Sequence, residues 1–535
     1  MSAGSLPDAL RQLADYADIR GASREADDWR QLAAGREAGE DDDRLRDFLL
    51  EGSDAVVLRA RSELPRLIRR LLETGALDSA GALWLARHGV VTAADLNAAI
   101  SEARLPHHPH VPATGLQTAA EVIARDETRV PLGRALDLVE GVTQMIRASC
   151  PEALHVSPVG DVRRFEPLVD ALVLAVGAPE PAAALEAICA LSTWQGVLHR
   201  SADRALLAYQ GAEIDVRVGS LPEFGTLLVT TTGARPHVMA LQARAQGISG
   251  CAREEDVYSR AGLPWIPPEL RHDTGELEAA AAGTLPRMVE RAHIRGDFHM
   301  HSTYSDGGDP LAHVVATAAG LGYEYIAITD HSERSAAVRT VSPAALARQA
   351  DEVAALRERF PDMVILHGIE VDIMPDGLLD FPDSVLETLD IVLASLHDRA
   401  GHDPATLTRR LLGAIAHPLV NVITHPLNQL VGRDTGYDMD FPAIYAAAAR
   451  TGTALEIDGA PGHLDLDGAH AREAIAAGVT VTIDSDGHRA RLLDRQMRMG
   501  IGTARRGWVE PRHVLNTRPT SEVRAFIAAK RTAKR

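Results

Sequence analysis

The chain has 535 residues, 46% of them hydrophobic and 24% charged, and its formal net charge is -19. At about 150 residues per domain this length predicts several domains, and since no apolar run of about 18 residues or N-terminal signal pattern occurs, we expect a cytoplasmic protein without a membrane partner. The negative charge argues against a protein that coats nucleic acid without specificity, because such binding relies on Lys and Arg side chains that neutralise phosphates.

The first half of the chain predicts two small domains. Residues 1–105 are rich in Leu, Ala, Arg and Glu at helical spacing, as in LPRLIRRLLETG, and predict a helical domain. Residues 106–255 contain a helix and then strand-like runs such as VDALVLAVG and AEIDVRVG, which indicate an α+β domain. The Pro-, Gly- and charge-rich residues 256–293 are expected to form a linker. Three widely spaced cysteines without a C-x-x-C pair indicate neither a disulfide framework nor a cysteine zinc site.

The second half has a different pattern. In residues 294–519, strand-like and helical runs alternate at an interval of about 30 residues, the length of a βα repeat. Seven such units with right-handed crossovers predict a closed or nearly closed parallel barrel. Residues 520–535, which end in AAKRTAKR, are expected to be a basic tail that keeps the chain end soluble. The expected fold class is therefore multidomain α/β.

Nearly every strand of this predicted barrel ends in a residue that can bind a metal ion. In the stretch RGDFHMHSTYSDGG, His299 and His301 lie two residues apart and so share one face of a strand, and an Asp follows in the next turn. The C-terminal ends of parallel barrel strands converge on one mouth. We therefore expect nine side chains to meet there, namely His299, His301, Asp306, His331, Glu370, His397, His425, Asp486 and His488.

Nine ligands imply two or three divalent metals, because zinc usually takes about four ligands and manganese about six. Manganese, zinc and iron all suit His and carboxylate ligands, and Glu370 is the best candidate for a bridging carboxylate. Metals about 3.5–4 Å apart polarise a phosphoryl oxygen, activate water and stabilise a leaving alkoxide, so the pattern favours hydrolysis of a phosphate ester. Amide hydrolysis is the competing chemistry. Binuclear barrels of that kind typically use a carbamylated lysine, and the chain's only lysines are Lys530 and Lys534.

The motifs DFHMHSTYSDG, YIAITDHS, HGIEVDIMPDG, ASLHD, ITHP and IDSDGH resemble, in this order, those of the PHP (polymerase and histidinol phosphatase) phosphoesterase domain. The resemblance covers roughly residues 294–519. It implies a distorted (βα)7 barrel in which all nine positions bind metals, typically as a trinuclear site. Asp330, beside His331, matches a further family residue at the site. Catalytic proton transfer is the role predicted for Asp330, with a hydrogen-bonding role behind the ligands as the alternative.

The first half is similar to bacterial family X DNA polymerases that carry a C-terminal PHP domain, through VGDVRR, VDALVLAV, AEIDVRV and TTTGARPHVMALQARA. This resemblance implies a nucleotidyltransferase-like core with three carboxylates, the first two at i and i+2 of one strand. Asp170 and Asp215 match the first and third, but Leu172 stands at the second and cannot bind Mg²⁺. We therefore expect a degenerate core with vestigial Asp170 and Asp215. The helical domain lacks recognisable G-x-G hairpins, which predicts a degenerate helix-hairpin-helix-like domain, and without a lysine there the family's Schiff-base lyase chemistry is also lost.

Together these patterns predict a PHP phosphoesterase that acts on DNA 3′ ends in DNA repair, as a 3′–5′ exonuclease or a 3′-phosphatase. Arg163 and Arg164 are candidate contacts to the DNA backbone. Three alternatives stay open. One is an active gap-filling polymerase, in which Asp161 replaces the missing carboxylate and Mg²⁺ is a cofactor. The others are a small-molecule phosphatase of the histidinol-phosphate type, and a non-catalytic first half that docks DNA or a protein for the PHP domain.

Overall fold

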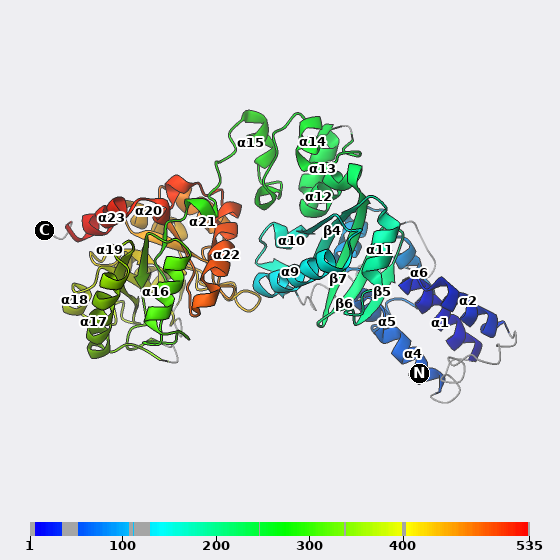
Figure 1. Ribbon diagram of the computed structural model, residues 1–535, viewed down its shortest axis with the longest axis horizontal. Helices are drawn as coiled ribbons and strands as arrows, with labels where there is room; N and C mark the ends of the chain where they lie inside the picture. The colour runs from blue at the N-terminus through cyan, green and yellow to red at the C-terminus, as the bar shows by residue number, and fades with distance from the viewer. Residues whose placement is uncertain are drawn as a thin grey trace. The chain divides into compact units, whose positions relative to one another are not determined.

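The chain is described by a computed structural model that covers residues 6–34, 52–105, 111, 129–245, 247–335, 339–398 and 403–532. It divides into two compact units. The first consists of Met1–Val130, Arg134–Arg163 and Leu168–Ala281, and the second of Pro131–Gly133, Arg164–Pro167 and Ala282–Arg535. Figure 1 shows a sheet with flanking helices in each unit. None of the described helices combines the length and the apolar character needed to cross a bilayer.

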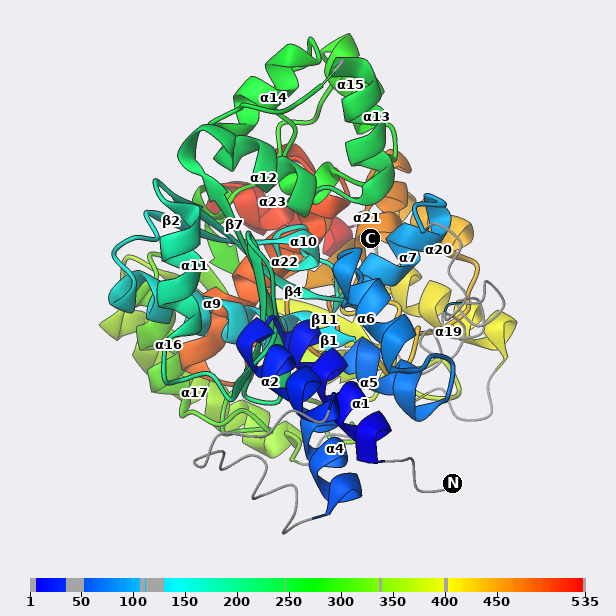
Figure 2. The same ribbon diagram turned by 90° about the vertical axis from the view of Figure 1, so that its right-hand side faces the viewer.

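The start of the first unit is helical. Its described helices are α1 (Leu6–Arg20), α2 (Ser23–Ala33), α4 (Ser53–Ser62), α5 (Arg66–Glu73), α6 (Ser79–Arg87) and α7 (Ala93–Ser101). Apolar residues at helical spacing gather on facing sides, so that Leu13 of α1, Trp29 of α2 and Val56 of α4 share one buried cluster. Figure 2 shows the three helices beside one another. Helix α7 starts at a capping box in which Asp95 accepts a hydrogen bond from the Thr92 backbone N–H.

A five-stranded sheet forms the centre of the first unit, in the order β2-β4-β7-β6-β5. Strands β4 and β7 run parallel and the other neighbouring pairs are antiparallel. All seven residues of β4 are buried, as its continuous apolar sequence LVLAVGA requires. The strands are β2 (His155–Val159), β4 (Leu172–Ala178), β5 (Gly196–Arg200), β6 (Arg204–Tyr209) and β7 (Ala212–Ser220), with β1 (Val130–Pro131) paired to β3 (Leu168–Val169). The accompanying helices are α9 (Leu132–Ser149), α10 (Gly160–Arg163), α11 (Pro181–Cys189) and α12 (Phe224–Thr232).

The predicted linker, residues 256–293, is only partly a connector. The helices α13 (Arg235–Ala245), α14 (Glu254–Arg260) and α15 (Glu276–Ala282) fold together at the end of the first unit. His237 Nδ1 lies 2.6 Å from Glu276 and its Nε2 lies 2.9 Å from the Tyr258 hydroxyl, and all three side chains are buried. This buried polar network gave no periodic signal, because its members lie far apart in sequence. The first unit therefore extends to Ala281.

The second unit is a parallel, nearly closed barrel, as its βα alternation predicts. Its seven strands follow one another in the order β14-β13-β12-β11-β10-β9-β8. They are β8 (Gly296–Asp297), β9 (Tyr325–Ile328), β10 (Val364–Asp372), β11 (Ile391–Ser395), β12 (Val422–Ile423), β13 (Ala454–Asp458) and β14 (Val481–Asp484). The helices of this unit are α16 (Leu311–Gly320), α17 (Pro343–Arg359), α18 (Asp383–Leu386), α19 (Pro404–Ala416), α20 (Phe441–Thr451), α21 (Gly468–Ala476) and α22 (Leu493–Arg506). Asp403, Asp440 and Asp467 cap α19, α20 and α21 by accepting backbone N–H bonds.

Alternate residues of each strand point into the barrel. The apolar residues inside are Phe298, Tyr325, Ala327, Leu366, Ile391, Leu393, Val422 and Ala454. Toward the C-terminal strand ends the same alternation reaches polar residues. On β9 the inward series runs from Tyr325 through Ala327 to His331, and on β11 it runs from Ile391 to His397. One end of the barrel is therefore a packed core, and the other is a polar mouth.

Helix α23 (Thr520–Thr532) closes the apolar end of the barrel. Val523 and Ile527 belong to the interior cluster, and Lys530, which is 5% exposed, donates to the Ile415 carbonyl at 2.9 Å. The prediction of a basic tail is therefore wrong for residues 520–532. The Lys and Arg residues of this segment led to the prediction of a tail, although the segment forms an amphipathic helix. Lys534 and Arg535 lie outside the described residues.

The edge strands β8 and β14 meet through side chains and a short bridge. Asn516 Nδ2 donates to the Gly296 carbonyl at 3.0 Å, and its Oδ1 accepts from the Ile483 N–H at 3.1 Å. At the mouth, His301 N donates to the Gly487 carbonyl at 3.1 Å, and Gly487 N donates to the His299 carbonyl at 3.2 Å. These bonds align the first and last strand ends, which carry four of the nine predicted ligands.

Candidate metal centre

The Glu370 carboxylate lies at the centre of the mouth, fully buried. Its Oε1 is 3.0 Å from His425 Nε2 and 3.3 Å from His397 Nε2. Its Oε2 is 2.8 Å from His331 Nδ1 and 3.4 Å from His299 Nε2. The two oxygens thus face different histidines, which is the arrangement that a carboxylate shared between two cations requires.

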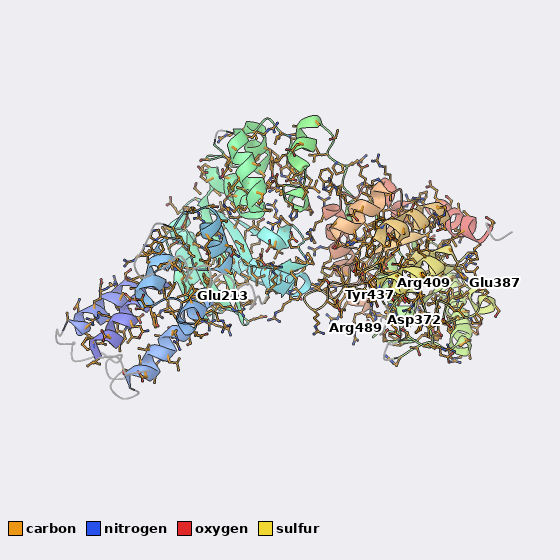
Figure 3. All side chains as sticks on the ribbon, turned by 180° about the vertical axis from the view of Figure 1, so that it is seen from behind. Glu213, Asp372, Glu387, Arg409, Tyr437 and Arg489 are labelled. Atoms are coloured by element: carbon orange, nitrogen blue, oxygen red, sulfur yellow. The ribbon has the colours of Figure 1, made fainter. Side chains whose placement is uncertain are left out.

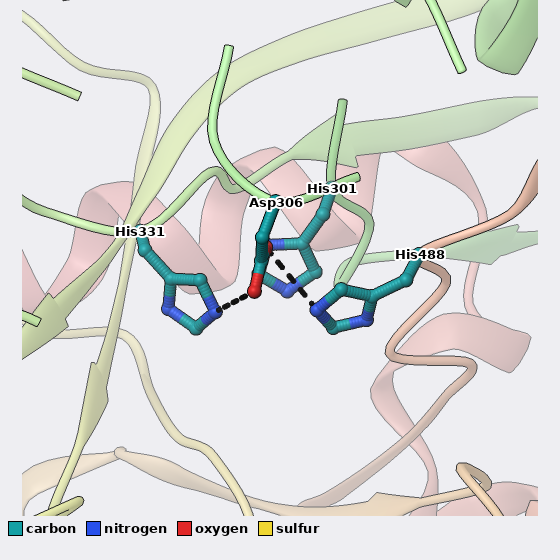
Figure 4. Close-up of side chains that lie close together, drawn as sticks. All are labelled: His301, Asp306, His331 and His488. Atoms are coloured by element: carbon teal, nitrogen blue, oxygen red, sulfur yellow. Dashed lines mark ion pairs between the residues drawn. The ribbon is translucent and has the colours of Figure 1, made fainter. Parts of the chain in front are cut away.

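A second group surrounds Asp306 (Figure 4). One ligand atom from each of His301, Asp306, His331 and His488 lies within 4.8 Å of the others. Asp306 Oδ1 is 3.3 Å from His488 Nε2, and Oδ2 is 3.6 Å from His331 Nε2. These residues come from the ends of three strands, as the convergence of parallel strands predicts.

A third group joins His299, His301 and Asp486. Asp486 Oδ1 is 3.0 Å from His301 Nε2 and 3.5 Å from His299 Nε2, and the two Nε2 atoms are 3.1 Å apart. Deep in the site, His301 Nδ1 and His425 Nδ1 make no hydrogen bond. Converging nitrogen and oxygen atoms without protein partners fit divalent cations, which take up lone pairs that are otherwise costly to bury.

Charge states at the centre favour metal binding. Burial, together with His488 and His331, lowers the pKa of His301 to about 3, and burial also lowers the pKa of His425 to about 4. Burial opposes the charge on Glu370, but the surrounding histidines outweigh it and hold the pKa of that carboxyl well below its usual range. Neutral imidazoles and a charged carboxylate are the forms that bind metals.

Other histidines of the site behave differently. Burial opposes the charged form of His299 and His331, but neighbouring carboxylates outweigh it and raise the pKa of both, and two histidines at the rim follow the same pattern. Burial alone lowers a histidine pKa, but Glu370 and Asp372 outweigh it at His397 and raise that pKa to about 10. Asp486 and Asp306 likewise raise the pKa of His488 to about 9. Both imidazoles must lose a proton when a cation binds, so metal uptake releases protons.

Carboxylates behind the ligands orient them, and sequence reasoning missed these residues. Glu456 lies 2.8 Å from His299 Nδ1, and Asp372 accepts a hydrogen bond from His397 Nδ1. The Tyr437 hydroxyl donates to the Leu396 carbonyl at 2.6 Å, next to His397 (Figure 3 labels Asp372 and Tyr437). Such contacts fix which imidazole nitrogen carries the lone pair. Strand periodicity could have found both carboxylates, because Asp372 follows Glu370 by two residues and Glu456 follows inward-facing Ala454 by two.

Asp330, predicted to transfer a proton, is fully occupied with hydrogen bonds. Its carboxylate accepts from the backbone N–H groups of Ser302 and Ser305 at 2.8 and 3.0 Å and from their hydroxyls at 2.7 and 2.5 Å. Gln349 Nε2 donates a fifth bond at 2.6 Å. This geometry favours the alternative role: Asp330 holds the loop between His301 and Asp306 in place.

The predicted vestigial carboxylates of the first unit are engaged with arginines. Asp215, 2% exposed, lies 2.7 Å from Arg204 Nε and 2.9 Å from Arg217 Nη2. Exposed Asp170 lies 2.8 Å from Arg129 Nε. Among the described residues, neither Asp170 nor Asp215 belongs to a cluster able to hold a metal ion.

The prediction that Arg163 and Arg164 contact DNA phosphates does not fit the structure. Arg163 Nη1 and Nη2 donate to the Glu254 carboxylate at 2.9 and 2.7 Å, and Nη1 also donates to Thr232 Oγ1 at 3.0 Å. Arg164 is buried, with 8% exposure. A guanidinium neutralised or buried inside the protein cannot contribute to binding a polyanion. The partner Glu254 is remote in sequence, so the motif alone gave no sign of this ion pair.

The comparisons with known proteins bear on the whole chain. Residues 297–438 match the PHP domain family. The DNA polymerase/3'-5' exonuclease PolX of Bacillus subtilis is 32% identical over 432 residues, which cover 77% of this chain and 75% of the relative. This chain belongs to the bacterial family X DNA polymerases that carry a C-terminal PHP domain.

Membership in the PolX family confirms the resemblance carried by the motifs and makes the chain an enzyme of the phosphoesterase class. A probable phosphatase of Syntrophotalea carbinolica is 32% identical over 176 residues, 32% of this chain and 68% of the phosphatase. The solved histidinol phosphate phosphatase of Lactococcus lactis, in complex with zinc, L-histidinol and phosphate, is 18% identical, with a TM-score of 0.32 over 40% of this chain and 94% of that chain.

Proposed function

We propose that the PHP unit hydrolyses phosphate esters at DNA 3′ ends, as a 3′–5′ exonuclease or 3′-phosphatase in DNA repair. The observation that carries the proposal is the bridging geometry of Glu370, whose two oxygens face different histidines. The nine predicted ligands hold two or three divalent cations in this proposal, manganese or zinc in the first place. His and carboxylate ligands suit both metals.

The chain's own residues prepare this site. Bound divalent metals supply the charge that polarises a phosphoryl oxygen and lowers the pKa of the attacking water. Burial keeps the imidazoles of His301 and His425 neutral, so that they offer lone pairs at neutral pH. Asp330 fixes the loop that carries Asp306, and Glu456 orients His299. The site is thereby arranged before substrate arrives, which lowers the reorganisation needed for reaction.

We further infer that the first unit no longer incorporates nucleotides. Leu172, 3% exposed in β4, stands where a second carboxylate would bind Mg²⁺. Asp215 has its negative charge balanced by two arginines, and its pKa is lowered by them despite its burial. Asp170 pairs with Arg129. A two-metal site needs clustered, uncompensated carboxylates, and this arrangement does not provide them.

The test uses one gapped DNA labelled near its 3′ end, with Mn²⁺, and compares the intact chain with His299→Ala and Asp170→Ala, with and without dNTPs. We expect shortening by the intact chain and by Asp170→Ala, a loss of about 100-fold or more in His299→Ala, and no extension in any sample. A 3′-phosphorylated copy of the same DNA separates phosphatase from exonuclease activity.

Two results would contradict the proposal. If the intact, Mn²⁺-loaded chain releases nothing from 3′-recessed or 3′-phosphorylated DNA, the DNA substrate is wrong. If dNTPs are incorporated and Asp170→Ala abolishes incorporation, the polymerase core is active and the inference from Leu172 fails.

A further inference from the structure

Strand β13 is the one barrel strand that contributes none of the nine predicted ligands. Its inward-facing series runs from Ala454 through Glu456 to Asp458, so it too ends in a carboxylate at the mouth. Glu456 is committed to His299 and to the His425 backbone N–H. Asp458, at the strand end itself, has a different environment.

Asp458 forms a further cluster with His463 and Asp486. One ligand atom from each of these three residues lies within 4.8 Å of the others. They come from β13, from the loop after β13 and from the loop after β14. The cluster shares only Asp486 with the nine-ligand centre.

Asp458 is incompletely satisfied where it lies. The side chain is fully buried, and its Oδ1 accepts from the Ala460 N–H at 2.6 Å. Its Oδ2 makes no hydrogen bond in the structure. Leaving a buried carboxylate oxygen without a partner is unfavourable, and a bound cation removes that cost.

His463 is oriented as metal-binding histidines are. Its Nδ1 lies 3.0 Å from the Gln429 carbonyl, which can only accept, so Nδ1 carries the proton and the lone pair is at Nε2. The ring stacks on His425, with centroids 5.3 Å apart and an interplanar angle of 22°. Both contacts hold the imidazole in one orientation beside the centre.

The two carboxylate oxygens of Asp486 differ in their contacts. His299 and His301 contact it at Oδ1, at 3.5 and 3.0 Å, and His488 Nδ1 lies 3.4 Å from the same oxygen. All three of these contacts are made by Oδ1, so they leave Oδ2 available to a different cation. A carboxylate divided in this way joins neighbouring metal positions, as Glu370 does at the centre.

We propose that Asp458, His463 and Asp486 form an additional divalent-cation position beside the nine-ligand centre. This inference rests on the proposed metal-dependent function. The position takes three protein ligands, and water or a substrate phosphate oxygen completes the coordination. Because it shares Asp486 with the nine-ligand centre, its cation binds after the others and more weakly.

The experiment counts bound metal in the full-length protein. The chain is stripped with a chelator, titrated with Mn²⁺ by calorimetry, and assayed for metal by mass spectrometry after gel filtration in a fixed excess of Mn²⁺. Wild type is compared with Asp458→Asn and His463→Gln. The matched controls are Asp440→Asn and His470→Gln. Asp440 caps α20, and Asn can also cap a helix, while His470 bonds to Asp467 outside the cluster.

We expect wild type and both controls to bind one more Mn²⁺ per chain than Asp458→Asn or His463→Gln. Metal-free Asp458→Asn should unfold at a temperature no lower than metal-free wild type, because it removes a buried carboxylate without a full set of partners.

Equal stoichiometry in all five proteins, with wild type binding two or three ions, would overturn this inference and leave the proposed function standing. Binding of no ion by wild type would overturn both.

Discussion

His397 depends on a carboxylate that lies behind it. Asp372 accepts a hydrogen bond from His397 Nδ1, which leaves Nε2 facing Glu370. Replacing Asp372 by Asn removes the charge that orients and polarises this ring, and losses of about 10–100-fold in metal affinity are typical of such changes. We expect Asp372→Asn to need about 10–100-fold more Mn²⁺ for half-maximal phosphoesterase activity.

The measurement is activity against free Mn²⁺ concentration in a metal buffer, with Asp376→Asn as the matched control. Asp376 is an exposed residue four positions beyond the strand end, and its carboxylate accepts a hydrogen bond from the Leu378 N–H. An unchanged midpoint for Asp372→Asn would show that the hydrogen bond does not tune the metal centre.

Residue types were predictable from sequence where chemistry and spacing combine. The i, i+2 pair of imidazoles indicates His299 and His301 as ligands, and a carboxylate within a largely apolar strand indicates Glu370. Arg163 and Asp330 could not be assigned from sequence. Their roles depend on partners supplied by distant segments, and chain spacing carries no information about those contacts.

At the scale of elements, ion pairs join strands β6 and β7 of the first unit to α7. Arg204 of β6 bonds to Asp215 of β7 and to Asp95 of α7, both at 2.9 Å through Nη2. We expect Asp215→Asn to lower the free energy of unfolding by about 1–3 kcal/mol, because it removes the buried charge that Arg204 and Arg217 share and leaves Asp95 as the carboxylate partner of Arg204. Phosphoesterase activity of the folded variant should stay at the wild-type level.

Urea denaturation with a spectroscopic readout checks this prediction. Asp170→Asn is the control, since an exposed ion pair contributes only about 0–1 kcal/mol. If both variants lose the same small amount, the Asp215 network does not hold these elements together.

Helix α23 makes a prediction about pH. Burial lowers the pKa of Lys530 to about 7, below the 10.5 of an exposed lysine. Between these values the unfolded chain binds a proton that the folded chain does not, so this residue makes the free energy of unfolding rise with pH from about 7 to about 10.5. Lys530→Met should flatten that rise, which amounts to about 1.4 kcal/mol per pKa unit.

The check is denaturation of wild type and Lys530→Met at intervals between pH 6 and 10.5, where the difference between the two curves isolates Lys530. A difference that does not change with pH would mean that Lys530 keeps its charge in the folded state.

Helix α23 could not be predicted from the sequence pattern. Its basic residues predicted a tail, and only the packing of Val523 and Ile527 identifies it as part of the barrel.

For the whole molecule, the division into two units predicts two thermal transitions. The predicted metal ligands all belong to the second unit, and a ligand stabilises only the unit that binds it. At a free metal concentration about 100 times the dissociation constant, that stabilisation is about 2.7 kcal/mol. Chelation should lower one calorimetric transition and leave the other in place. A single transition that shifts as a whole would show that the units unfold together.

The barrel was predictable, because βα alternation is a regular signal along the chain. The end of the first unit was not, since α14 and α15 look like a Pro- and Gly-rich connector until the network of His237, Tyr258 and Glu276 is seen. Buried polar networks assemble from separate segments and leave no periodicity.

The packed end of the barrel has a consequence for turnover. Because α23 and the apolar interior fill that end, reactants reach the metal centre and leave it through the same polar mouth. A released product must depart before the next substrate can enter. Product should therefore compete directly with substrate, and steady-state kinetics should show competitive product inhibition.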